Sequence, residues 1–344
     1  EVAAPGERLK IVASTGIIAH FAEQIAGDDA DVTSVIPPGA DAHSFQPTTE
    51  AIRNVAAADL VVVNGYNLEE STLGTIFEQL REDATLVIAT AGITPLEGGG
   101  HHHDDEGHDD EEGHDDEEGH DDDEGHDDDE GHDDEEGHDD DADHDDGHDD
   151  EEGHDDEEKI KVAAEHELAI ADGDPHMWLT VPNAMAYVRN IANAIVAADP
   201  DNATAYRERE EAYLAELQKL DEEVRAAISS IPEESRVLIV YHDAFQYLAA
   251  EYGLELAATL LPGNPSQQAS AAAVAEVIEI VGDRKVEAVY REPQFAAEAI
   301  EAIADEAGVR VLTLYSAAFT DEVDTYLKLM RANANALVDG LGGG

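Results

Sequence analysis

Short apolar runs alternate with helical patterns along this chain, in one series near its start and a second near its end. The first series has apolar runs at residues 9–13, 32–36, 60–63 and 86–89. Helical patterns separate these runs, around residues 17–26, 49–58 and 69–80. Strand and helix signals that alternate in this way are typical of βα units around a mainly parallel sheet. This pattern therefore predicts an α/β lobe.

The second series begins beyond Pro232 and has the same character. Its apolar runs lie at residues 237–241, 254–260, 286–290 and 309–314, with helical patterns between them and one after. We therefore expect a second βα lobe built like the first. In the stretch before this second series, a further helix is expected after Pro182, because proline lacks the N–H that a first helical turn leaves unpaired.

One long helix is predicted between the two series. Residues 203–229 contain no Gly or Pro. Their apolar side chains recur at spacings of three, four and seven, which places Tyr206, Tyr213, Leu217, Leu220, Val224 and Ile228 on one stripe. At 1.5 Å per residue the helix is roughly 40 Å long. The expected fold is α/β, with lobes at residues 1–200 and 231–344, mainly parallel sheets, and a single rigid linking helix at 203–230.

An acidic, histidine-rich tract interrupts the first lobe at residues 98–158. From His101 onward it holds 12 of the 17 histidines and 37 of the 83 acids, and it contains no Lys or Arg. Because Ala142 is its only apolar side chain, the tract has almost nothing to bury, and we expect it to be disordered. Imidazole is a common ligand of transition metals, so the tract suggests weak, interchangeable metal binding, although a merely solvated acidic loop is the alternative.

The remainder of the chain is also strongly acidic. Outside the tract, 46 acids stand against 18 Lys and Arg. We interpret this as adaptation to high salt, where the screening length falls to about 3 Å, with an acidic protein of ordinary salt as the alternative. The charge excludes nucleic acid as a partner. Cysteine is absent, which excludes disulfides and thiolate metal sites, and no apolar stretch is long enough to span a membrane.

Three of the five histidines outside the tract are candidate metal ligands. His43 follows a predicted strand, His242 ends another, and His176 lies in an Asp-Pro-His segment beside the only Trp. Ligands of open α/β sheets gather beyond the carboxyl ends of strands. Three neutral imidazoles suit zinc, and nearby carboxylates hold their second ring nitrogens. His20 and His166 are more readily explained as structural or solvated residues.

Five segments carry a resemblance to a known family. They are residues 38–47 (PGADAHSFQP), 58–65 (ADLVVVNG), 174–179 (DPHMWL), 242–247 (HDAFQY) and 292–295 (EPQF). Together they resemble the metal-binding subunits of zinc and manganese ABC importers, the cluster A-I solute-binding proteins. The similarity is greatest to the zinc branch, which often carries a His/Asp-rich insertion, and a haloarchaeal source fits the acidity.

The resemblance implies that the metal lies in the cleft between the lobes, bound by His43, His176 and His242. It also implies a membrane permease as partner and no enzymatic activity. We accordingly expect a monomer that captures Zn²⁺ at the extracellular face of the membrane, held there by a lipid anchor, with the tract as a weak collector. Manganese members replace the third histidine by a carboxylate, so His242 favours zinc over Mn²⁺.

Two positions depart from the family pattern, and other functions stay open. Tyr315 stands where many relatives carry an acid, and Ala42 where some zinc members carry Glu, so the fourth coordination position is unassigned. Water, or a side chain from the tract, is available to fill it. The alternatives are a manganese-binding relative, a metal buffer acting through the tract alone, and a zinc hydrolase or lyase, because three histidines and a water also describe catalytic zinc.

Overall fold

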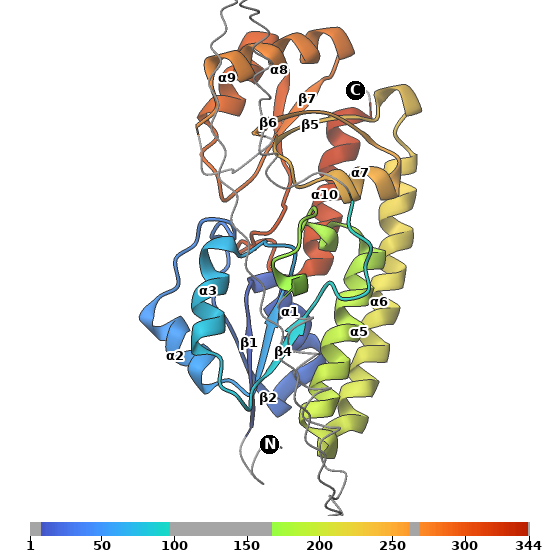
Figure 1. Cartoon of the computed structure of the whole chain (residues 1–344). Coiled ribbons are helices and arrows are strands. Elements are labelled where there is room, and N and C mark those ends of the chain that lie inside the picture. Colours follow the sequence, from blue (N-terminus) through green and yellow to red (C-terminus); the bar gives the residue numbers. More distant parts are fainter. Residues whose placement is uncertain (1–7, 97–166, 262–267, 343–344) are drawn as a thin grey trace, which may run out of the picture.

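The structure is a computed structural model, and it describes residues 8–96, 167–261 and 268–342. The predicted disorder of residues 98–158 and the position of His166 therefore lie outside the described residues. Two α/β lobes stand one above the other, with long helices running along one side of both (Figure 1). The predicted fold class is confirmed, whereas the predicted limits of the lobes stay a prediction.

The first lobe is built on a four-stranded parallel sheet. Its strands are β1 (Leu9–Ala13), β2 (Ala30–Ser34), β3 (Leu60–Val63) and β4 (Thr85–Ile88), in the order β2-β1-β3-β4. Its helices are α1 (Gly16–Ala26), α2 (Thr49–Ala57) and α3 (Glu70–Gln79). Every residue of β3 is buried, as expected for a parallel strand covered on both faces. β2 begins two residues earlier than predicted, because Ala30 pairs with Leu9 and the apolar Val35 lies beyond the paired register.

The second lobe repeats this plan. Its strands are β5 (Val237–His242), β6 (Glu255–Leu261), β7 (Ala288–Arg291) and β8 (Arg310–Thr313), all parallel, in the order β6-β5-β7-β8. Its helices are α7 (Gln246–Tyr252), α8 (Ala271–Arg284), α9 (Glu298–Ala307) and α10 (Tyr326–Leu341). Short 3₁₀ turns occur throughout the described residues, in both lobes and between the long helices: η1 (Gly27–Asp29), η2 (Met177–Leu179), η3 (Pro200–Asn202) and η4 (Glu233–Ser235).

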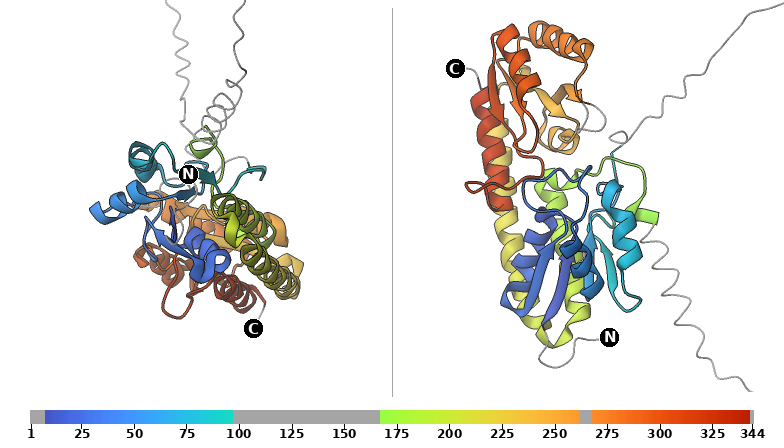
Figure 2. Two further views of the ribbon diagram at one scale, coloured as in Figure 1. Left: turned by 90° about the horizontal axis from the view of Figure 1, so that it is seen from below. Right: turned by 90° about the vertical axis from the view of Figure 1, so that its left-hand side faces the viewer.

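One long helix, α6 (Ala203–Ser229), connects the lobes, and α5 (Val181–Ala198) precedes it on the first lobe. α5 begins with Pro182 in its first turn, as predicted. The whole predicted stripe of α6 is buried, and it packs against α1 and α5 on the first lobe and against α7 and α10 on the second. The right-hand view of Figure 2 shows α6 running along both lobes from a further direction. Its uninterrupted backbone holds the two sheets at a set separation.

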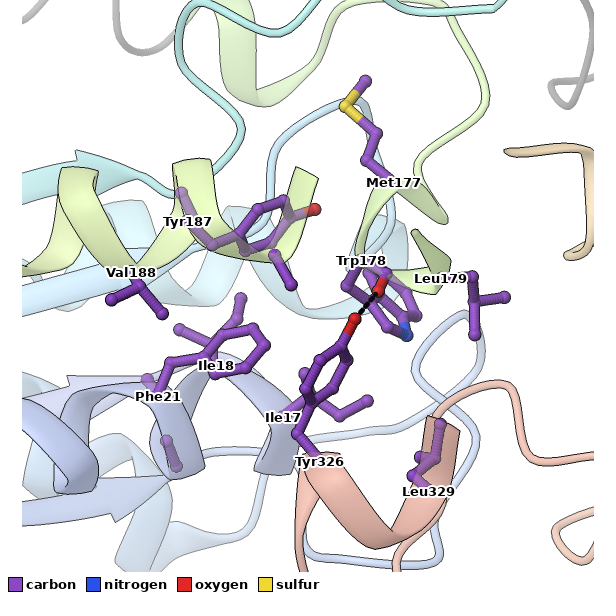
Figure 3. Packing of buried hydrophobic residues seen from close by; sticks show 14 of the residues in the cluster. Ile17, Ile18, Phe21, Met177, Trp178, Leu179, Tyr187, Val188, Tyr326 and Leu329 are labelled. Carbon is purple, nitrogen blue, oxygen red and sulfur yellow. Dashed lines mark hydrogen bonds between the residues drawn. The ribbon is translucent and has the colours of Figure 1, made fainter. Parts of the chain in front are cut away.

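The C-terminal helix α10 also reaches the first lobe, which the sequence did not predict. The rings of Tyr326, at the start of α10, and Phe21 of α1 have centroids 5.0 Å apart. The Tyr326 hydroxyl donates a 2.7 Å hydrogen bond to the carbonyl of Trp178 (Figure 3). α10 is thus a second connection between the lobes.

The helices in the described ranges all lack the combination of length and apolar character needed to cross a bilayer.

Candidate metal centre

His43 lies in the irregular segment between β2 and α2, on the first lobe. Its backbone N–H donates to Asp41 Oδ1 at 3.1 Å, and its carbonyl accepts a 2.9 Å bond from the Ser71 hydroxyl of α3. The bond from Ser71 fastens the segment to the first turn of α3. The side chain of His43 is half-buried, whereas those of His176 and His242 are buried.

His176 is held by a carboxylate two residues before it. Asp174 Oδ1 accepts from the backbone N–H of His176 at 2.9 Å and faces its ring Nδ1 at 2.8 Å. A proton on Nδ1 leaves Nε2 as the free lone pair, which is the arrangement that metal-binding histidines adopt. That Nε2 lies 3.2 Å from Nε2 of His43. Two nitrogens on one tetrahedral zinc, each bonded at about 2.0–2.1 Å, lie about 3.3 Å apart.

His242 is the last residue of β5, and its partner comes from the loop after β7. Its Nδ1 lies 2.7 Å from Glu292 Oε1, and the other oxygen of Glu292 accepts from the Ser316 hydroxyl. Burial alone lowers the pKa of His242, but the charge and hydrogen bond of Glu292 outweigh it, so the pKa is raised. Nε2 of His242 is buried and has no hydrogen-bond partner among the described residues. That nitrogen is therefore available to bind a ligand.

The three predicted histidines meet at one point between the lobes. Each offers a ring nitrogen, and these three nitrogens lie within 4.8 Å of one another. They border a cavity of about 10 Å³. The side chains and backbone around it belong to Asp41, Ala42, Leu68, Trp178, Gln294, Phe295, Ser316 and Ala317. A space of about one water-sized sphere holds a single ion rather than an organic ligand.

Four hydrogen bonds join the segment that carries His176, together with the first residue of α5 that follows this segment, to elements of the second lobe. The Trp178 indole donates to the carbonyl of Ser316 at 2.6 Å, and the Tyr326 hydroxyl donates to Trp178 O. From α7, the Tyr247 hydroxyl donates to Asp174 O at 2.9 Å. The hydroxyl of Tyr252, also on α7, accepts from the N–H of Val181 at 3.1 Å. These bonds fix the position of His176 relative to His242.

Other residues considered from the sequence fall outside this cluster. His20 is buried on α1 beside Tyr213 and Phe319, and burial lowers its pKa to about 4 despite the nearby charge of Asp324. Tyr315 does not border the cavity, and its backbone pairs with the Asn333 side chain of α10.

Sequence reasoning did not single out Asp174 as the partner of His176, or Gln294 as a cavity residue. The Asp-x-His spacing is a local signal for the Asp174 contact, because two residues bring the carboxylate within reach of both the backbone and the ring. The position of Gln294 depends on contacts across the lobe.

Fold and site together define a two-lobed binding protein with a cluster of imidazoles between its lobes. The chain matches the family model described as ZnuA, zinc-uptake complex component A, periplasmic, over residues 11–340. Because the match spans nearly the whole chain, the chain belongs to this family, and it is a metal-binding, substrate-binding component of an ABC importer. Such a component works with a membrane permease and is not an enzyme, which overturns the hydrolase alternative.

Individual relatives carry different metals in their names. The iron-binding protein YfeA of Yersinia pestis is 28% identical over 340 residues, which cover 98% of this chain and 87% of the relative. The manganese ABC transporter substrate-binding lipoprotein PsaA of Streptococcus anginosus is 25% identical, covering 98% and 91%. The periplasmic zinc-binding protein TroA of Treponema pallidum shares the fold, with a TM-score of 0.72 at 22% identity, covering 98% and 100%.

Proposed function

We propose that the cargo is Zn²⁺, bound by His43, His176 and His242 in the cleft between the lobes. The observation that carries the proposal is the meeting of three ring nitrogens, two of them on imidazoles whose Nδ1 faces a buried carboxylate. Borderline-soft zinc suits such a nitrogen-rich set, whereas manganese prefers oxygen ligands. The two carboxylates, Asp174 and Glu292, also balance the double charge of the ion, although they contact the histidines and are not themselves ligands.

We further propose that a chain with this site captures zinc outside the cell as a monomer and delivers it to the permease. Relatives that are named as lipoproteins support a lipid anchor as the means of attachment. The tract at residues 98–158 then acts as a weak collector, because many low-affinity ligands raise the local metal concentration beside a stronger site. Manganese is the alternative cargo, which the manganese-named relatives favour.

The test is loss of one histidine from the cluster against loss of one outside it. His176→Ala should abolish high-affinity zinc binding in the full chain, because two imidazoles cannot hold the ion as three do. His20→Ala is the matched control, since it removes another buried histidine but leaves the cluster complete. Zinc affinity is measured by competition with a chelator that binds zinc more tightly than the tract does, so that the tract does not contribute to the measured affinity. If the two variants bind zinc equally well, the proposed site is wrong.

A further inference from the structure

Gln294, in the loop after β7, borders the cavity together with the three histidines. Its side-chain amino group makes two hydrogen bonds, donating to the Ser316 hydroxyl at 2.7 Å and to Glu292 Oε2 at 3.1 Å. Its amide oxygen, Oε1, is buried and has no hydrogen-bond partner among the described residues. A buried acceptor without a hydrogen bond is unfavourable unless another group, such as a metal ion, binds to it.

The orientation of the Gln294 amide follows from its neighbour. Rotating the amide by half a turn would place its oxygen against the carboxylate of Glu292, where two acceptors repel each other. The amino group therefore faces Glu292 and Ser316, and the oxygen faces away from them. Glu292 thus orients two groups at once, with one oxygen facing Nδ1 of His242 and the other accepting from the Gln294 amino group.

The remaining side-chain oxygens around the cavity are already engaged. Asp41 accepts from the backbone N–H of His43 with Oδ1 and from the Ser44 hydroxyl with Oδ2. The Ser316 hydroxyl donates to Glu292 and accepts from Gln294. Within the described part of the chain, Gln294 Oε1 is accordingly the cavity-bordering side-chain oxygen that lacks a hydrogen-bond partner.

We propose that the amide oxygen of Gln294 is the fourth ligand of the metal ion, a role that rests on the proposed function of the site. Zinc takes four ligands in a tetrahedron, and three imidazoles leave one position. A neutral oxygen suffices there, because Asp174 and Glu292, each bonded to a ligating histidine, already supply two negative charges. Completion of the shell by protein atoms excludes water from the ion and lets Gln294 influence which metal is preferred.

The experiment compares Gln294→Leu with Gln218→Leu in the full chain, where Gln218 is an exposed residue of α6. Zinc affinity is measured by chelator competition, and thermal unfolding of both metal-free variants checks that each is folded. Gln294→Leu should weaken zinc binding by at least about tenfold, the lower end of the loss expected when a supporting group of a metal site is removed. Gln218→Leu should bind as the unmodified chain does.

A crystal structure of the zinc-loaded full chain gives a second measurement that needs no variant. We expect Gln294 Oε1 at about 2.0–2.2 Å from the zinc, the usual Zn–O distance. A water molecule between Oε1 and the ion, or unchanged affinity in Gln294→Leu, overturns the inference. If the unmodified chain itself lacks a tight zinc site, the proposed function fails instead, so the two failures are distinguishable.

Discussion

The two lobes share one strand order but use the ends of their central strands differently. In the first lobe, the polar residues after β1 and β3 are Ser14 and Asn64, and the Ser14 hydroxyl and the Asn64 backbone N–H both donate to the buried carboxylate of Glu69. In the second lobe, the corresponding places are taken by His242, at the end of β5, and Glu292, after β7. Here too a carboxylate joins the two strand ends, through the 2.7 Å contact with Nδ1 of His242.

This difference shows what topology decides and what it leaves to individual side chains. Parallel strands bring polar groups together just beyond their carboxyl ends in both sheets. In the first lobe the short Ser14 side chain donates to Glu69, and Ser14, Asn64 and Glu69 are all buried inside the lobe. In the second, the longer imidazole of His242 uses one nitrogen for the carboxylate and presents the other to the cleft. The same architecture therefore holds a structural group in one lobe and one histidine of the proposed metal site in the other.

Neutralising each carboxylate in turn should affect the two lobes very differently. Glu292→Gln should weaken zinc binding by about 10–100-fold, because an amide facing Nδ1 of His242 no longer favours the tautomer that binds metal. Glu69→Gln should leave zinc affinity within a few-fold of the unmodified chain. Both variants are compared by chelator competition at neutral pH. Equal losses in the two would mean that the carboxylates have the same role.

A smaller effect concerns stability in the first lobe. Burial raises the pKa of Glu69, against the opposing hydrogen bonds from Ser14 and Asn64. The folded chain therefore holds this proton more tightly than the unfolded chain. The resulting stabilisation is fully present below the unfolded pKa and is lost as the pH rises through the raised folded value.

Glu69→Gln removes this titration, so its unfolding free energy relative to the unmodified chain should increase as the pH rises from about 4 to about 8, a range that begins near the ordinary pKa of Glu. Denaturant unfolding of both proteins at several pH values measures the difference. A difference that stays constant with pH would show that the carboxyl titrates alike in the folded and unfolded chains.

Much of the fold is visible in the sequence because the signals are local. Strand β3 is buried on both faces, so its apolar run coincides with the strand. Helix α6 has the predicted bounds because neither Gly nor Pro interrupts its stripe. β2 was misplaced by two residues because Val35 and Ile36 are apolar and buried, yet lie beyond the end of the strand. The contact between α10 and the first lobe joins residues more than a hundred positions apart, which no local pattern records.

The site divides in the same way. Strand-end positions made His43 and His242 candidates, and the resemblance of the flanking motifs to the family selected the three histidines together, which the structure brings within 4.8 Å of one another. The position and amide orientation of Gln294 beside the cavity were not predictable, because they depend on Glu292 and Ser316, and Ser316 approaches only when the sheet of the second lobe is assembled.

We propose that one tight zinc site lies in the cleft and is independent of the histidine-rich tract. The experiment is calorimetric titration of a chain lacking residues 98–158, with zinc and with manganese in turn. We predict one zinc per chain, bound more tightly than manganese. Loss of nearly all zinc binding would place the site in the tract, and tighter manganese binding would contradict the assignment of the metal.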